Sequence, residues 1–224
     1  MKCVILAAGE GKRVRPLTYT RPKVMLPIAN KPILEWNLTN AIDSGFKKFI
    51  FVVAYKSEMV RNYFGYGKNW GVSIEYINQK EALGTAHAIG VVEKFVDDFV
   101  VLSGDTIFGK KDIKNIMENK NSMGIVTVEN AKDYGTVEIK NKKIIKVHEK
   151  IDRPVTNTIN AGIYHFNKKI FDYIRKTKKS IRGEYEITDS INLFLKNEEL
   201  KGIFLKEFKD VVYPWDLFDA NEEI

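Results

Sequence analysis

The stretch that decides the fold runs from Leu6 to Lys23, reads LAAGEGKRVRPLTYTRPK, and continues the apolar run Cys3–Leu6. An apolar strand that opens into a turn of small residues lets backbone N–H groups approach a polyphosphate closely. A dense group of cations follows the turn: Lys12, Arg13, Arg15, Arg21 and Lys23. The stretch therefore predicts a buried strand whose carboxyl end carries a phosphate site.

Two familiar phosphate loops do not fit these residues. A Walker A loop would need glycine at Leu6 and Ser or Thr at Arg13, and a dinucleotide fingerprint would need glycine at Val14. The alternatives are a different glycine-rich phosphate loop, or an ordinary glycine turn beside a solvated basic face.

Length and composition predict one large globular domain over residues 1–224, with 44% apolar residues for a core. No apolar run reaches the ~20 residues of a membrane span. Only six apolar residues separate Lys2 from Gly9, which is too few for a signal peptide. The single cysteine, Cys3, has no disulfide partner in the chain and is expected to be buried in its strand. These features predict a cytoplasmic protein without a membrane partner.

The net charge of +7 raises the alternative of a basic nucleic-acid-binding protein. Much of the excess lies in the pairs 168–169, 175–176 and 178–179, which flank a helix-like stretch and are typical of a solvated face. Aromatic residues that would stack on bases are not interleaved with them. A small, phosphate-rich substrate explains the remaining cations, so no nucleic-acid partner is predicted.

Apolar runs alternate with helical patterns along the whole chain. We expect strands at 2–6, 48–53, 72–77, 98–102, 124–128, 161–166 and 202–206, and helices at 32–44, 57–63, 85–95, 110–118, 168–175 and 187–196. Ser57 is predicted to cap one helix and Gly45 to end another. Such alternation indicates an α/β fold: a Rossmann-like mixed, mainly parallel sheet with helices on both faces.

The pattern changes between Tyr134 and Lys150. Alternating segments at 136–140 and 144–148 flank Asn141-Lys142-Lys143, which predicts a β-hairpin, an antiparallel β insertion in the sheet. Elsewhere, the glycine turn after Leu6, Gln79 and Asp105 all follow predicted strand ends. Because open α/β sheets bind ligands at the carboxyl edge of their strands, we expect these three features at one rim.

The glycine turn resembles the signature loop of the sugar-1-phosphate nucleotidylyltransferases, Leu-Ala-(Ala/Gly)-Gly-x-Gly-x-Arg followed by Pro-Lys. The matching positions are Leu6, Ala7, Ala8, Gly9, Gly11, Arg13, Pro22 and Lys23. The likeness extends over 1–221 and is to the glucose-1-phosphate thymidylyl/uridylyltransferase and N-acetylglucosamine-1-phosphate uridylyltransferase domains of archaeal enzymes. It implies that Arg13 and Lys23 are catalytic and that the first five residues bind nucleotide. Many relatives continue into a left-handed β-helix, which we do not expect within this chain.

Three further segments resemble that family. Gln79 to Ala88 is similar to its base-recognition segment, which implies that Gln79, Gly84 and Thr85 bind the nucleotide; a glutamine amide offers both a donor and an acceptor to a pyrimidine edge. A glycine-threonine helix start without a ligand is the alternative.

Gly104-Asp105 stands where the family has a magnesium ligand, and Asp210 stands in its Trp-x-Asp-x-Gly motif as the second one. Here Phe208 replaces the tryptophan and Val212 the glycine, so the register of that strand is open. Taken alone, Asp105 could equally cap the following helix. The resemblance implies Mg²⁺ as the cofactor.

The remaining resemblance lies on the sugar side of the site. It assigns Gly135, Glu149, Asn160 and Glu184 to sugar hydroxyls and Lys150 to the sugar phosphate. Taken alone, Glu149-Lys150 is an ordinary surface pair and Asn160 an ordinary turn residue.

Together these features imply an Mg-dependent enzyme that joins a nucleoside triphosphate to a sugar-1-phosphate and releases pyrophosphate. UTP or dTTP is favoured as nucleotide, and glucose-1-phosphate or N-acetylglucosamine-1-phosphate as acceptor. Mannose-1-phosphate, N-acetylmuramate-1-phosphate and phosphocholine stay open as acceptors. A non-catalytic regulatory paralogue that binds nucleotide-sugars is the alternative from another class, and a homo-oligomer is compatible with the sequence.

Overall fold

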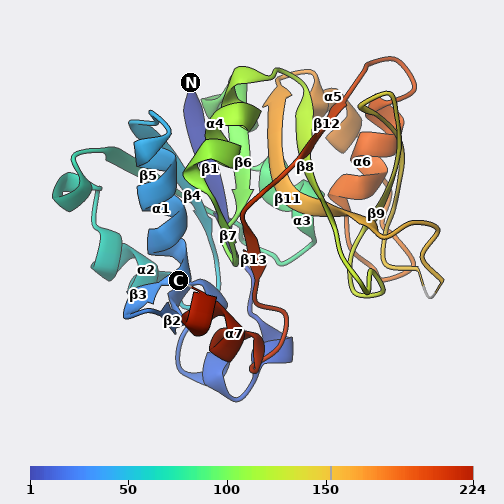
Figure 1. Cartoon of the computed structure of the whole chain (residues 1–224). Coiled ribbons are helices and arrows are strands. Elements are labelled where there is room, and N and C mark those ends of the chain that lie inside the picture. Colours follow the sequence, from blue (N-terminus) through green and yellow to red (C-terminus); the bar gives the residue numbers. More distant parts are fainter. Residues whose placement is uncertain (152, 224) are drawn as a thin grey trace. The chain divides into compact units, whose positions relative to one another are not determined.

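The computed structural model describes residues 1–151 and 153–223 (Figure 1). The chain divides into two compact units. The first unit comprises Met1–Ala82, Leu102–Lys114 and the segment from Glu207 onward, and the second comprises Leu83–Val101 and Asn115–Lys206. The prediction of one domain over 1–224 stays a prediction.

The first unit is built on a parallel sheet of strands β5 (Ser73–Asn78), β4 (Lys48–Val53) and β1 (Lys2–Ala7), with β4 in the middle. Every residue of β4 after Lys48 is buried, which is typical of parallel strands covered on both faces. The carboxyl ends of these strands meet at one edge, since all three run in the same direction.

The helices of the first unit begin and end close to the predicted positions. Helix α1 (Ile33–Asp43) is followed by Gly45 in a left-handed conformation (φ 110°), as predicted for its stop. Helix α2 (Ser57–Phe64) is different: the residue before it, Lys56, takes the left-handed conformation and occupies the cap position. The prediction that Ser57 caps α2 is therefore wrong. Helix α7 (Asp216–Glu223) lies beside strand β2 (Pro27–Ile28) (Figure 1).

Two short strand pairs in the first unit were not predicted. Strand β2 (Pro27–Ile28) pairs with β3 (Lys31–Pro32), and β7 (Thr106–Phe108) pairs antiparallel with β13 (Phe208–Asp210). With two or three residues each, these strands are too short to show an alternating pattern in the sequence.

The second unit contains a mixed sheet in the order β6-β11-β8-β12-β10-β9. Its strands are β6 (Asp98–Ser103, of which the first four residues belong to this unit), β8 (Ser122–Thr127), β9 (Thr136–Lys140), β10 (Lys143–His148), β11 (Thr158–Asn167) and β12 (Lys201–Phe204). Strand β8 runs parallel to β12 but antiparallel to β11. The hairpin β9–β10 confirms the predicted antiparallel insertion.

Helices α3 (Thr85–Gly90), α5 (Ile170–Ile174) and α6 (Ile187–Phe194) pack against one another in the second unit (Figure 1). Helix α3 is shorter than predicted because the chain leaves it after Gly90 and forms a separate 3₁₀ turn at Glu93–Phe95. Helix α4 (Lys110–Glu118) has the predicted bounds, and the chain passes from one unit to the other within it. Over the described residues, no helix combines the length and apolar character needed to cross a membrane.

Candidate active site

The glycine turn after β1 is folded back onto Lys23. Gly11 has a φ of +69°, and a Cβ at this position would lie only 2.7 Å from the Cβ of Lys23. The Thr18 hydroxyl donates a hydrogen bond of 2.9 Å to the Gly11 carbonyl. A side chain at Gly11 would therefore be strained by its backbone conformation and would displace Lys23.

Asp105 lies directly beside this turn. The Gly104 N–H donates to the Leu6 carbonyl over 2.9 Å, and a Cβ on Gly104 would lie 2.4 Å from the same oxygen. The Lys23 ammonium nitrogen is 2.8 Å from Oδ2 of Asp105. Asp105 therefore forms an ion pair with Lys23 beside the glycine turn, and its role as a metal ligand stays a prediction.

Asp210 reaches the same cation from strand β13. Its partner in the strand pair is Thr106, whose hydroxyl donates to Oδ1 of Asp210 over 3.2 Å. Lys23 Nζ lies 3.9 Å from that oxygen. The strand register is thus defined even though Phe208 and Val212 depart from the family motif.

The two carboxylates differ electrostatically. Partial burial works against ionisation of Asp105, but the charge and hydrogen bond of Lys23 hold its pKa below the ordinary value. Burial raises the pKa of Asp210 to about 6; Lys23 opposes this shift and the charge of Asp105 adds to it.

Asp105 and Asp210 fit a magnesium site. Both offer oxygen ligands, which Mg²⁺ prefers, and their sharing of the Lys23 ammonium shows that they converge on one positive charge. Among the described residues, no group of three or more His, Cys, Asp or Glu side chains could hold a metal ion. Because Mg²⁺ commonly takes one or two carboxylates and completes its shell with water and substrate phosphates, a pair is sufficient.

Arg13 is supported by the segment that follows β13, a feature that sequence reasoning missed. Its guanidinium lies over the Tyr213 ring, 5.9 Å from the centroid, and that ring stacks on Trp215 at 4.8 Å. The Asp216 carboxylate fixes the turn by accepting 2.7 Å hydrogen bonds from the N–H groups of Val212 and Tyr213. The chain that carries Asp210 therefore also supports Arg13.

A cavity of about 510 Å³ opens beside the glycine turn in the first unit. Its lining residues are Ala8, Glu10, Ala54, Tyr55, Ser57, Asn78, Gln79, Lys80 and Ala82. Gln79 is held at the end of β5 by its N–H, which donates to the Val53 carbonyl over 2.9 Å. The cavity thus joins two predicted nucleotide-binding elements, the glycine turn through Ala8 and the base segment through Gln79.

Gly84 and Thr85 lie in the second unit, against the segment that contains Glu184. Gly84 has a φ of +106°, and a Cβ there would lie 2.5 Å from the Tyr185 carbonyl oxygen. The Thr85 hydroxyl accepts a 3.0 Å hydrogen bond from the Ile187 N–H. This close approach explains the glycine, and it places part of the predicted base segment next to a predicted sugar-binding residue.

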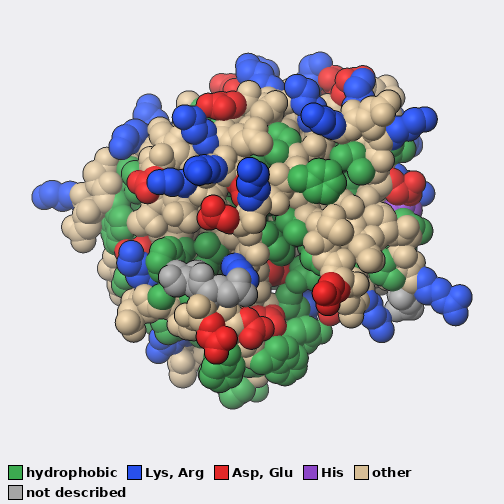
Figure 2. Space-filling model, viewed as in Figure 1, with side chains coloured by type: hydrophobic (Ala, Val, Ile, Leu, Met, Phe, Trp, Pro, Cys, Tyr) green, Lys and Arg blue, Asp and Glu red, His purple; other side chains and the backbone are tan. Residues whose placement is uncertain are grey.

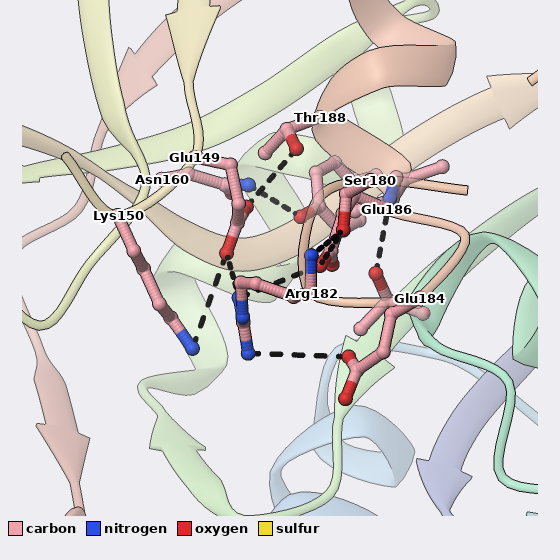
Figure 3. Close-up of polar contacts among 11 residues, drawn as sticks. Glu149, Lys150, Asn160, Ser180, Arg182, Glu184, Glu186 and Thr188 are labelled. Carbon is pink, nitrogen blue, oxygen red and sulfur yellow. Dashed lines mark hydrogen bonds and ion pairs between the residues drawn. The ribbon is translucent and has the colours of Figure 1, made fainter. Parts of the chain in front are cut away.

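The predicted sugar residues gather around Glu149 in the second unit (Figure 3). Its Oε2 accepts a 3.0 Å hydrogen bond from the Thr188 hydroxyl, and its Oε1 lies 3.9 Å from the Lys150 ammonium. The Asn160 N–H donates to the Gly135 carbonyl over 2.8 Å, and a Cβ on Gly135 would lie 3.6 Å from Oε2 of Glu149. Gly135, Glu149, Lys150 and Asn160 therefore share one region.

Arg182 is the functional candidate that sequence reasoning missed. Its guanidinium donates to Oε1 of Glu149 over 3.0 Å, and it lies 3.4 Å from Oε1 of Glu186 and 4.0 Å from Oε2 of Glu184 (Figure 3). Burial and the charge of Glu149 raise the pKa of Glu186, although Arg182 acts in the opposite direction. The sequence clue to Arg182 was its position as the first residue of the segment RGEYEITD. In a chain with so many basic residues, one arginine cannot be singled out by its type.

Three cations of the basic run around α5, namely Lys168, Lys169 and Arg175, pair with acids. Lys169 Nζ lies 2.6 Å from Oε1 of Glu198, and Arg175 pairs with both Glu93 and Asp172. Figure 2 shows Lys and Arg side chains interspersed with Asp and Glu on the visible face. All six cations of the run, at 168–169, 175–176 and 178–179, are exposed, which confirms the predicted solvated face.

Comparison with known proteins agrees with this geometry. A family model described as "Nucleotidyl transferase" matches residues 2–224. The chain belongs to the nucleotidyl transferase family. Over 225 residues it is 41% identical to the protein named bifunctional protein GlmU of Methanocaldococcus jannaschii, covering 99% of this chain and 54% of that protein.

Two further proteins are similar along the whole chain. A Sulfurisphaera tokodaii protein named bifunctional sugar-1-phosphate nucleotidylyltransferase/acetyltransferase is 38% identical over 99% of this chain and 55% of its own length. A crystal structure from Bacillus anthracis, assigned as a glucose-1-phosphate thymidylyltransferase, has a TM-score of 0.90 and 31% identity, over 100% of this chain and 94% of that one. The chain spans about half the length of the curated relatives it matches.

Proposed function

We propose that the protein is a sugar-1-phosphate nucleotidylyltransferase. It joins UTP or dTTP to glucose-1-phosphate or N-acetylglucosamine-1-phosphate, giving an NDP-sugar and pyrophosphate. The observation that carries the proposal is the cluster of Lys23, Asp105 and Asp210 at the edge of the glycine turn. Such a cluster offers a metal site and a cation beside backbone groups suited to phosphate.

On the nucleotide side, the residues of the turn (Leu6, Ala7, Ala8, Gly9 and Gly11) bind the nucleotide through their backbone. The planar Arg13 guanidinium donates two hydrogen bonds to phosphate oxygens, whereas the Lys23 ammonium acts as a point charge. Gln79 reads the pyrimidine edge from the cavity wall, and Gly84 and Thr85 contribute from the start of α3.

On the acceptor side, Gly135, Glu149, Asn160 and Glu184 bind the sugar hydroxyls. Lys150 binds the phosphate monoester. Arg182 is a second cation for that phosphate, because it is already held beside Lys150 by their common partner Glu149.

The chemistry requires little of the protein beyond positioning and charge. A phosphate monoester is largely dianionic at pH 7, so its oxygen attacks the α-phosphorus without a general base. The barrier is the mutual repulsion of two polyanions, which Arg13, Lys23 and Lys150 reduce. Asp105 and Asp210 would hold Mg²⁺, which supplies further positive charge to the phosphates when bound.

The names and structures of the similar proteins support this function over the alternatives. A non-catalytic paralogue would have no reason to keep Lys23 between two carboxylates. We also propose that the sheet is Rossmann-like, with helices on both faces. The protein is proposed to be cytoplasmic and to form a homo-oligomer. Mannose-1-phosphate, N-acetylmuramate-1-phosphate and phosphocholine remain the alternative acceptors.

The test is pyrophosphate release by the purified protein with ATP, CTP, GTP, UTP and dTTP, each paired with every acceptor named above. We expect release with UTP or dTTP and a sugar-1-phosphate, in the presence of Mg²⁺ and not with excess EDTA. Binding of a nucleotide-sugar without any pyrophosphate release would favour the regulatory paralogue instead. No binding and no release would refute both functions.

A further inference from the structure

We propose that Glu10 recognises the ribose of the bound nucleotide, so that the site takes a ribonucleoside triphosphate such as UTP in preference to its 2′-deoxy counterpart. This inference rests on the proposed function and narrows its nucleotide. It concerns the side chain between the two glycines of the turn, Gly9 and Gly11.

The position of Glu10 in the cavity is the first observation. The cavity has room for a nucleoside, since small-molecule sites occupy roughly 300–1,000 Å³ and this one measures about 510 Å³. Its Gln79 wall takes the base, and the glycine turn takes the phosphates. Because the ribose links base to phosphates, it must lie between these two elements, where Glu10 lines the cavity.

The second observation is that the Glu10 carboxylate is fixed in its ionised form. Arg15 donates a hydrogen bond to its Oε1, and the Lys12 ammonium lies 3.4 Å from its Oε2. Desolvation works against ionisation, but the Arg15 hydrogen bond and the charges of Lys12 and Arg15 together outweigh it and lower the pKa of Glu10. An ionised carboxylate offers about four lone-pair sites, so two remain after these contacts and can accept hydroxyl protons.

The loop itself holds these partners in place. Arg15 lies over the Tyr19 ring, 5.2 Å from its centroid. The Tyr55 hydroxyl, from the cavity wall, donates to the carbonyls of Thr18 at 3.0 Å and Tyr19 at 3.3 Å. The contacts of Arg15, Tyr19 and Tyr55 therefore position Glu10 before any ligand binds. This reduces the entropy cost of ordering the side chain on binding.

Glu10 is well suited to accept from a pair of sugar hydroxyls, because both of its oxygens are charged acceptors. Glu10 is the sole carboxylate among the nine lining residues, and Lys80 can only donate. The Tyr55 proton is used by the loop, and the Asn78 side-chain oxygen already accepts a 3.1 Å bond from Arg61. Carboxylates that accept the ribose 2′-hydroxyl are an established solution in other nucleotide sites.

A carboxylate so near a triphosphate would be repulsive if it were alone. Here Lys12 and Arg15 each contribute one positive charge against the single negative charge of Glu10. The group as a whole is positive, so it can accept hydroxyl protons without repelling the phosphates.

The experiment compares UTP with dUTP, which differ only at the 2′ position, in the wild-type protein, Glu10→Ala, Glu10→Gln and Glu58→Gln. Glu58 is an exposed acid next to the lining residue Ser57, so its change matches the charge difference without touching the cavity. The readouts are the UTP/dUTP ratio of kcat/KM for pyrophosphate release, and the ratio of the two dissociation constants measured by calorimetry without acceptor. Thermal unfolding of each variant checks its folding.

We expect the wild-type ratio to be at least ~10, as for one hydrogen bond to a charged group. The ratio should fall to about 1 in Glu10→Ala, keep an intermediate value in Glu10→Gln, and stay at the wild-type value in Glu58→Gln. Freed Arg15 and Lys12 side chains change the affinity for both nucleotides alike, and this effect cancels in the ratio.

An equal preference for UTP and dUTP in the wild-type protein would overturn the inference, and so would a ratio that survives in Glu10→Ala. Both results leave the nucleotidylyltransferase function intact. If the wild-type protein neither binds these nucleotides nor releases pyrophosphate, the proposed function fails, and the inference fails with it.

Discussion

Replacing Lys23 with methionine keeps the length of the side chain and removes the positive charge that Asp105 and Asp210 share. Lys23 is 9% exposed, Asp210 16% and Asp105 42%. Breaking a fully buried ion pair costs about 3–5 kcal/mol, whereas an exposed pair is worth at most ~1 kcal/mol. For this partly buried cluster we expect a loss of about 2 kcal/mol, or about 4–8 °C in Tm for a chain of this size.

The same change tests the metal site. Once the ammonium is gone, Mg²⁺ has no competitor for the two carboxylates. A ligand that binds only the folded protein stabilises it by about 2.7 kcal/mol at one hundred times its Kd. Millimolar Mg²⁺ should therefore restore most of the lost stability in Lys23→Met and raise the Tm of the wild-type protein by much less.

The assay is thermal unfolding of the wild-type protein, Lys23→Met and Lys169→Met, each with Mg²⁺ and with EDTA. Lys169 is the matched control, since it pairs with a single carboxylate, Glu198, at 2.6 Å. Its variant should show no rescue by Mg²⁺. If Mg²⁺ stabilises Lys23→Met no more than the control, Asp105 and Asp210 form a structural ion-pair cluster and not a metal site. Pyrophosphate release by Lys23→Met should fall at least ~100-fold, as for loss of one donor to developing charge.

Three further changes have defined outcomes. Gly104→Ala places a Cβ 2.4 Å from the Leu6 carbonyl oxygen and should lower the free energy of unfolding by about 1–3 kcal/mol, as measured by thermal unfolding. The same variant should also release pyrophosphate more slowly, because the clash displaces Asp105. Arg182→Met should raise KM for the sugar-1-phosphate and leave KM for the nucleotide unchanged in steady-state kinetics; equal changes in both would contradict its assignment. Burial and the Glu149 charge raise the pKa of Glu186, so its protonation stabilises the fold below about pH 4.5, and this contribution is lost as the pH rises. A Tm profile between about pH 4 and pH 8 should accordingly fall less steeply with pH in Glu186→Gln than in the wild-type protein.

Much of the fold could be predicted because local patterns and tertiary packing agree. The bounds of β4 and α4 match the predicted ones, since a continuous apolar run and a strongly amphipathic segment leave little choice. The stop of α1 at Gly45 follows from the left-handed conformation that glycine favours. The hairpin β9–β10 follows from alternation on both sides of a polar turn.

The errors have a common physical origin in contacts that no local pattern encodes. Strands β7 and β13 pair across about one hundred positions of sequence, and their pairing rather than the replaced motif residues determines where Asp210 lies. At α2, Lys56 adopts a left-handed conformation, which residues other than glycine, asparagine and aspartate rarely do, so serine was the natural but wrong cap. Arg182 could not be distinguished by residue type, because its role depends on the three carboxylates around it.

Those carboxylates belong to a pattern that recurs in both units. Three cations near the proposed phosphate sites each pair with an acid of their own unit. Lys23 pairs with Asp105, Arg15 pairs with Glu10 and Arg182 pairs with Glu149. An anion that approaches must compete with an acid already in place, so a single inorganic phosphate gains little from any one of these cations. At Lys23, a polyanion that brings its own divalent cation would change the balance, because the metal would take the oxygens of Asp105 and Asp210 and leave the ammonium to a phosphate. The pairing at Lys23 is therefore expected to favour metal-bound triphosphate over inorganic phosphate, which brings no metal for Asp105 and Asp210.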